Sequence, residues 1–227
     1  MGGGGHQLPR FRGGPAPAVG VVIAIDGPAG SGKSTIARAV ATRLRYDYLD
    51  TGAMYRAVAF AVLARGIDPF DREAVAAVAR DVRIELGPPV VVDDMDATEA
   101  IRGREVTGVV SVVAAQPDVR TEMVRRQREL VTPMAGVVVE GRDITTVVFP
   151  DAEVKVFLTA SEEERAGRRA LQNAESDTVG VALDLARRDR FDSTRTASPL
   201  RVADAAVVID TTGVTIDEVV EQVLALL

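Results

Sequence analysis

Short apolar runs recur along the chain, each bounded by glycine, proline or polar residues. Such runs are typical of strands buried on both faces, and they lie at 21–25, 136–140, 153–158 and 206–210. The sequence YDYLD at 46–50 predicts one further short strand. Between the strands, apolar residues recur at helical spacing and predict helices at 35–44, 54–65, 71–80, 109–115, 118–130, 161–173, 178–191 and 215–226. Strands that alternate with helices predict an α/β fold, a parallel sheet with helices on both faces.

The pattern changes between residues 82 and 106. Three short strand-like pieces, separated by Gly-Pro-Pro and Asp-Asp-Met-Asp, lie at 82–86, 90–92 and 101–106. Because glycine, proline and aspartate favour turns, this segment predicts a small antiparallel insert. Residues 1–20 are rich in glycine and proline, and we interpret them as a disordered leader or a cloning remnant.

The clearest chemical signal follows the first predicted strand. Residues 27–34, GPAGSGKS, match the phosphate-loop pattern G-x-x-x-x-G-K-[ST] and lie between a predicted strand and a predicted helix. The alternative is a glycine-rich surface turn, but such a turn does not require a strand before it and a helix after it. The glycines let backbone N–H groups approach a phosphate chain, and the helix start adds its positive dipole end. We expect Lys33 to contact the β- and γ-phosphates and Ser34 to ligate Mg²⁺. The expected ATP-binding residues are Gly27, Pro28, Ala29, Gly30, Ser31, Gly32, Lys33, Ser34 and Thr35.

Composition excludes several function classes. The chain has no cysteine, and its single histidine, His6, lies in the leader, which excludes thiol nucleophiles and histidine acid–base catalysis. A net charge of −6 argues against nonspecific nucleic-acid binding. No apolar run approaches the roughly 18 residues that a membrane span needs. We therefore expect a cytoplasmic protein that acts on small molecules, as a monomer, without nucleic-acid or membrane partners.

Charged residues follow two of the predicted strands. The carboxyl ends of parallel strands collect active groups, so we expect Arg56 and Arg142 to lie near the phosphate loop. An ordinary solvated helix arginine is the alternative for Arg56. A buried guanidinium needs an anion, which for Arg142 is either Asp143 or a substrate phosphate. Glu140 either holds Mg²⁺ through water or caps the next helix, and both interpretations stay open.

Further arginines gather in the last third of the chain. Arg165, Arg168 and Arg169 share one side of a predicted helix, and residues 188–195 are almost all charged or hydroxylic. Phosphoryl transfer asks mainly for alignment and electrostatic stabilisation, which arginines supply. The chain has no Asn-Lys-x-Asp guanine motif. Arginines on both sides of the donor site suggest a second anion as acceptor, such as a nucleoside monophosphate.

These motifs resemble the bacterial cytidylate kinases from about residue 21 to the end. The resemblance is carried by GPAGSGKST at 27–35, LDTGAMYR at 49–56, TEAIR at 98–102, GRDITTVVFP at 141–150, SEEER at 161–165 and RDRFD at 188–192. It implies a P-loop fold with a CORE at 21–62 and 121–227, an NMP-binding insert at 63–120 and a LID at about 165–178. It also implies ATP-dependent phosphorylation of CMP and dCMP.

The resemblance also implies site residues. The acceptor phosphate would meet Arg56, Arg142 and Arg195, the cytosine Ser111 and Arg120, and the sugar Arg188 and Asp192. Tyr55 and Thr51 belong to the same expected acceptor site, and Asp143 is the acidic partner in Gly-Arg-Asp. The expected catalytic residues are Lys33, Arg142, Asp143, Arg165, Arg168 and Arg169, the last three swinging onto the phosphates as the LID closes.

Two positions depart from the family pattern. Thr145 stands where glycine is usual, and Thr51 where serine is usual. We expect a slightly different turn at Thr145 and an extra methyl group near the acceptor sugar at Thr51. Two other functions stay open from the residues alone: a nucleotide-sensing phosphate-loop protein, and a small-molecule kinase of the shikimate or gluconate type.

Overall fold

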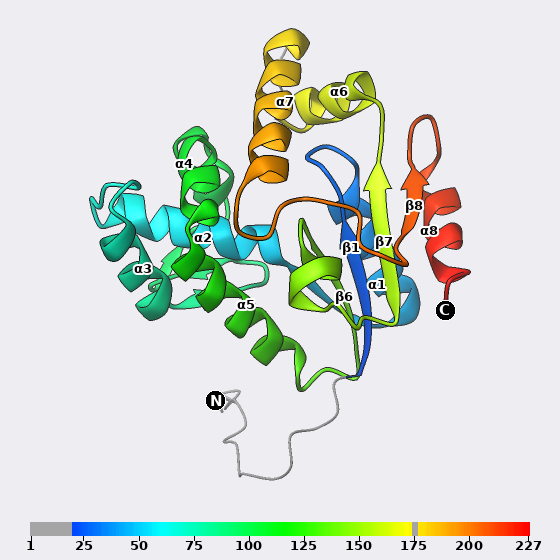
Figure 1. The fold of residues 1–227 in the computed structure, drawn as a ribbon, viewed down its shortest axis with the longest axis horizontal. Coiled ribbons are helices and arrows are strands. Elements are labelled where there is room, and N and C mark those ends of the chain that lie inside the picture. Colours follow the sequence, from blue (N-terminus) through cyan, green and yellow to red (C-terminus); the bar gives the residue numbers. More distant parts are fainter. Residues whose placement is uncertain (1–19, 174–176) are drawn as a thin grey trace, which may run out of the picture.

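A five-stranded parallel sheet forms the centre of the molecule (Figure 1). The computed structural model describes residues 20–173 and 177–227. The strand order is β2-β6-β1-β7-β8, and every neighbouring pair is parallel. The strands are β1 (Val21–Asp26), β2 (Asp47–Asp50), β6 (Gly136–Gly141), β7 (Val154–Thr159) and β8 (Val207–Asp210). The predicted parallel α/β fold is confirmed.

Helices cover both faces of this sheet. They are α1 (Lys33–Leu44), α2 (Thr51–Ala64), α3 (Arg72–Asp81), α4 (Arg104–Ala115), α5 (Pro117–Val131), α6 (Glu162–Asn173), α7 (Thr178–Thr194) and α8 (Ile216–Leu224). Val22 and Ala24 of β1 pack toward α2 and α5, whereas Ile23 and Ile25 pack toward α1 and α8. Successive strand residues point to opposite faces, which explains why β1 is apolar at every position.

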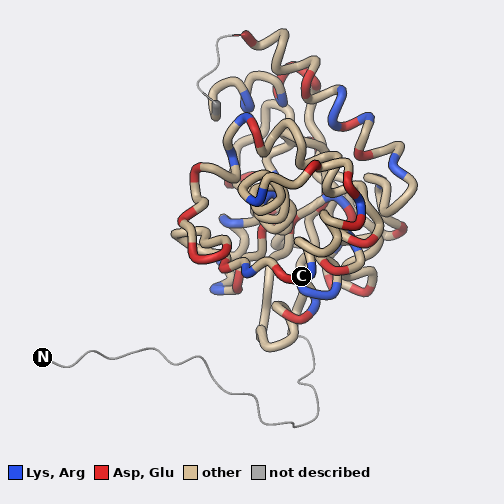
Figure 2. Tube along the Cα trace, turned by 90° about the vertical axis from the view of Figure 1, so that its left-hand side faces the viewer, with Lys and Arg blue, Asp and Glu red and all other residues tan. Residues whose placement is uncertain are grey.

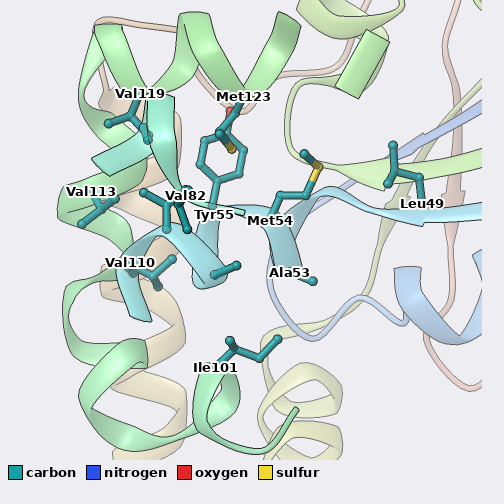
Figure 3. Packing of buried hydrophobic residues seen from close by; sticks show 14 of the residues in the cluster. Leu49, Ala53, Met54, Tyr55, Val82, Ile101, Val110, Val113, Val119 and Met123 are labelled. Carbon is teal, nitrogen blue, oxygen red and sulfur yellow. The ribbon is translucent and has the colours of Figure 1, made fainter. Parts of the chain in front are cut away.

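A larger apolar cluster joins α2, α3, α4 and α5 to one face of the sheet. Figure 3 shows Tyr55 of α2 beside Met123 of α5, with Val110 and Val113 of α4 nearby. Because residues of the first turns of α2 are buried in this cluster, the position of Arg56 in the same part of the helix is fixed. Acidic and basic residues are interspersed along most of the visible trace (Figure 2).

The insert differs from its prediction at the third strand. The small antiparallel sheet consists of β3 (Ile84–Glu85), β4 (Val91–Val92) and β5 (Met95–Asp96). The strand predicted at 101–106 is wrong, because η1 (Ala100–Arg102) and the start of α4 occupy those residues. The buried residues Val106, Val110 and Val113 of α4 follow helical spacing, and this period prevails over the local β-branched composition. The predicted domain bounds stay a prediction.

Helices α6 and α7 form a hairpin above the carboxyl end of β1 (Figure 1). A third cluster, Ala29, Ala166, Ala170, Val181 and Leu185, packs the phosphate loop against both helices. The predicted leader, apart from Gly20, and residues 174–176 of the predicted LID lie outside the described residues. No helix in the described ranges has the length and hydropathy needed to cross a bilayer.

Gly136, the first residue of β6, tests how closely the amino-terminal end of the sheet is packed. A Cβ on Gly136 would lie 2.6 Å from ring atoms of Tyr46. We expect Gly136→Ala to lower the free energy of unfolding by about 1–3 kcal/mol, because the ring has to move aside. Gly108 of α4 is the matched control: nothing lies within 4 Å of its added Cβ, so Gly108→Ala should be stabilising by about 0.5–1 kcal/mol. Urea unfolding of both variants measures the difference, and equal effects would contradict it.

Candidate functional site

A cleft of about 730 Å³ opens at the carboxyl edge of the sheet. Its walls come from the phosphate loop, α2, α4, α5, the end of β6, the α6–α7 hairpin and the segment after β8. The predicted site residues that line it are Ala29, Gly30, Ser31, Gly32, Lys33, Ser34, Thr35, Tyr55, Arg56, Ser111, Arg120, Arg142, Asp143, Arg168, Arg169, Arg188, Asp192 and Arg195. Gly27, Pro28, Thr51 and Arg165 are outside the lining. Arginines far apart in the sequence therefore share one cleft.

The phosphate loop has the backbone of an anion cradle. Gly30 and Gly32 have φ values of 79° and 85°, in the left-handed region that favours glycine. Helix α1 begins at Lys33 without a side-chain cap, so its first N–H groups are available to an anion. The Lys33 Nζ donates to Pro28 O at 2.6 Å. Burial and the nearby Arg142 guanidinium lower the pKa of Lys33 to about 7.

Glu140, at the end of β6, is buried beside this lysine. Tyr48 donates its hydroxyl hydrogen to Glu140 Oε1. Burial and the Asp50 carboxylate raise the pKa of Glu140, against the Lys33 ammonium, which lowers it. The capping alternative for Glu140 is wrong, because the N–H groups at the start of the next helical turn donate to another carboxylate.

That carboxylate is Asp26, which sequence reasoning missed. Its two oxygens accept from Ile144 N at 2.9 Å and from Thr145 N and Oγ1 at 2.7 and 2.6 Å. They hold the π-helical turn η2 (Ile144–Val148) against the strand that leads into the phosphate loop. Thr145, the departure from glycine, thus contributes a hydroxyl donor to the turn. Asp26 is the acidic residue that ends an otherwise apolar strand, and this position was the signal in the sequence that could have identified it.

Several arginines that line the cleft form ion pairs with carboxylates. Arg142 Nε donates to Asp192 Oδ2 at 3.0 Å, and Arg195 lies 3.5 Å from the same carboxylate. Asp143 pairs instead with Arg120, and both side chains are buried. Arg142 therefore contacts Asp192 and not the expected Asp143, and a contact with a substrate phosphate stays a prediction. The pairing of Asp143 with Arg120 satisfies two buried charges at once.

Arg56 and Arg188 are different, because no carboxylate of the described residues lies within 4 Å of either. Arg56 Nη1 donates to Ile101 O at 3.1 Å and to Thr107 Oγ1 at 3.0 Å, so Arg56 is not simply a solvated helix arginine. Burial and Arg188 lower the pKa of Arg56 to about 9. Burial and Arg142 lower the pKa of Arg188 to about 10, and its Nε is buried without a hydrogen-bond acceptor. Two such guanidinium groups in one cleft offer the positive charge and N–H donors that an anion requires.

The other residues expected at the acceptor base and sugar do not all lie in the cleft. Ser111 and Tyr55 line the cleft, and the Arg120 guanidinium lies 5.2 Å from the centroid of the Tyr55 ring. Thr51 is buried, and its hydroxyl donates to Glu140 O at 2.7 Å. A contact between Thr51 and the acceptor sugar stays a prediction.

The three arginines of α6 do not act as one group. Arg165 pairs with Asp189 and donates to Ala29 O at 3.1 Å, and the Arg165 side chain itself does not line the cleft. Arg168 donates to Thr211 Oγ1 and O, both at 2.8 Å, and Arg169 donates to Gln172 at 2.8 Å. Arg168 and Arg169 line the cleft.

Comparisons with known proteins identify the family of the chain. A family model described as cytidylate kinase matches residues 23–227. The cytidylate kinase of Geobacillus kaustophilus is 51% identical over 213 residues, 90% of this chain and 95% of that protein. The cytidylate kinase of Mycolicibacterium paratuberculosis is 50% identical over 210 residues, 88% of this chain and 92% of that protein.

Solved structures extend the likeness of the fold. An uncharacterized protein from Eubacterium ventriosum is 13% identical and covers 90% of this chain and 96% of its own, with a TM-score of 0.51. At this identity the likeness concerns the fold alone. The match to the family model and the two curated relatives show that the chain belongs to the cytidylate kinase family and is a nucleoside monophosphate kinase.

Proposed function

We propose that the protein transfers the γ-phosphoryl group of ATP to CMP and dCMP. The observation that carries the proposal is the pair of half-buried arginines, Arg56 and Arg188, that lack carboxylate partners and share a cleft with the phosphate loop. A nucleoside monophosphate supplies the missing anion. Its phosphate oxygen is already ionised, so the transfer needs no strong general base.

The donor half uses the phosphate loop. Backbone N–H groups at the start of α1 bind the phosphate chain, and Lys33 leaves Pro28 O to reach the β- and γ-phosphates. Arg168 and Arg169 approach the transferring group when the hairpin closes, exclude water and limit wasteful hydrolysis.

The residues present suit Mg²⁺. Ser34 and Glu140 offer two oxygen ligands at the cleft, and no group of three His, Cys, Asp or Glu side chains suited to a metal occurs in the described ranges. Mg²⁺ typically takes one or two protein ligands and completes its shell with phosphates and water. When bound, Mg²⁺ neutralises charge on the β- and γ-oxygens.

In the acceptor half of the cleft, different residues contact the phosphate and the base of the monophosphate. Arg56, Arg142 and Arg188 face the acceptor phosphate; the missing carboxylate favours this role for Arg188 over the sugar contact expected from sequence. Asp192 positions Arg142 and also lies 3.5 Å from Arg195, whose expected contact with the acceptor phosphate stays part of the proposal. Arg120 and Ser111 reach the cytosine edge, with Arg120 held in place by Asp143.

An acceptor profile tests the proposal. We expect ADP release in a coupled assay to be faster with CMP and dCMP than with UMP or AMP, and to be absent with shikimate or gluconate. Without acceptor, ADP release should stay low. No turnover with CMP, or faster turnover with AMP, would sink the proposal, and tight ATP binding without acceptor-dependent ADP would favour a nucleotide sensor.

Arg142 provides a test of the acceptor site. We expect Arg142→Ala to lower kcat/KM by about 100-fold or more, because a preorganised charge near the transferring oxygens is lost. The melting temperature should fall only slightly, since Asp192 keeps Arg195 as a partner 3.5 Å away. Arg83→Ala, which removes an exposed ion pair with Asp94, is the control and should change neither quantity. Intact activity with a large drop in melting temperature would contradict the assignment.

Lys33 makes nucleotide binding sensitive to pH. Its pKa of about 7 in the free protein means that the amine is largely neutral at pH 8. The bound triphosphate favours the ammonium and raises the pKa, so binding takes up a proton and weakens as pH rises above about 7, by at most about tenfold per unit. Titration calorimetry with a magnesium-bound ATP analogue at pH 8, in two buffers of different ionisation enthalpy, measures the uptake. Lys33→Met should abolish the buffer dependence; identical enthalpies for the unmodified protein would refute the assignment.

A further inference from the structure

The backbone of Ala29, at the tip of the phosphate loop, is held by both helices of the α6–α7 hairpin. Its N–H donates to Asp189 Oδ1 of α7 at 3.1 Å, and its carbonyl accepts from Arg165 Nη1 of α6 at 3.1 Å. Arg165 and Asp189 also pair with each other. The Ala29 methyl group is buried among apolar residues of the same two helices. The loop tip therefore has few ways to move without moving the hairpin.

The peptide group between Pro28 and Ala29 is bound at both edges. Its carbonyl accepts from Lys33 Nζ at 2.6 Å, and its N–H is the donor to Asp189. Under the proposed function Lys33 has to release this carbonyl when it turns to the triphosphate. Occupation of the donor half thus changes the restraint on a peptide group whose other edge is tied to α7.

Helix α7 carries that restraint to the acceptor half. Asp189 faces the phosphate loop, whereas its neighbour Arg188 and, further along, Asp192 and Arg195 line the cleft. Asp192 in turn holds Arg142. A small shift of Asp189 along a continuous helix therefore displaces the arginines and the carboxylate that meet the second nucleotide.

We propose that Arg165 and Asp189 are positioning residues that couple ATP binding to CMP binding through the Pro28–Ala29 peptide group. This inference rests on the proposed function. It also changes the expected role of Arg165, which acts on the loop backbone and not on the transferring phosphate. Neither side chain needs to touch a nucleotide.

The experiment measures the coupling directly. The dissociation constant of a magnesium-bound, nonhydrolysable ATP analogue is determined by calorimetry on the full chain, without and with saturating CMP. We expect CMP to tighten the analogue by about fivefold or more in the unmodified protein. Asp189→Asn and Arg165→Met should each reduce this factor to below about twofold, and the double variant should lose no more than either single variant.

The controls separate coupling from folding. Asp184→Asn breaks an exposed pair with Arg187 on the same helix and should leave the coupling factor unchanged. Should Asp189→Asn fail to fold, Arg165→Lys, which keeps the positive charge, provides the second measurement and should retain part of the coupling. Unchanged coupling in the variants, uniform weakening of both nucleotides, or no coupling in the unmodified protein would overturn the inference. Absence of CMP turnover in the unmodified protein would instead overturn the proposed function.

Discussion

Buried positive charge is the constraint on which the rest of the structure depends. Arg56, Arg188 and Lys33 all have lowered pKa values because burial and neighbouring guanidinium groups disfavour their charged forms. A fold that gathers like charges away from water needs a compensating gain. Under the proposed function, a pair of nucleotides brings several negative charges into the same cleft and provides that gain, which would account for arginines that lack carboxylate partners.

The carboxylates near the cleft bind some of the arginines and leave others without a partner. Asp192, Asp143 and Asp189 each pair with an arginine and fix its direction, whereas Arg56 and Arg188 remain without a carboxylate. Asp26, fully buried at the end of β1, likewise binds only backbone and hydroxyl donors of the η2 turn. On α7 the two kinds of residue are neighbours: Asp189 and Asp192 hold arginines in place, whereas Arg188 has no carboxylate partner among the described residues.

Sequence reasoning predicted the parts of the molecule that depend on local pattern. The apolar run 21–25 and the glycine spacing of 27–32 led to the parallel sheet and the phosphate loop, because both follow from short-range geometry. The strand at 101–106 failed, since a few β-branched residues fit either period. The charge partner of Arg142 was not predicted either: Arg142 contacts Asp192, fifty residues away, and not the adjacent Asp143, which was one of its two expected anions. The rotation of α7 about its axis decides that pairing, and no local pattern encodes it. Asp26 was missed because a residue that ends a strand was treated as a boundary and not as an acceptor.

The division of labour on α6 follows from the same energetics. To reach a transferring phosphate, Arg165 has to leave Asp189 and the carbonyl of Ala29, and the side chain is buried, so two strong contacts and a buried carboxylate would be left unsatisfied. Arg168 gives up bonds to Thr211 and a half-exposed pair with Glu164, a smaller loss that water partly replaces. Helical spacing alone puts the three arginines on one side, but burial separates them into one that anchors the loop and two that face the cleft. If the hairpin closes as proposed, Arg165 would keep it attached to the phosphate loop while Arg168 and Arg169 move.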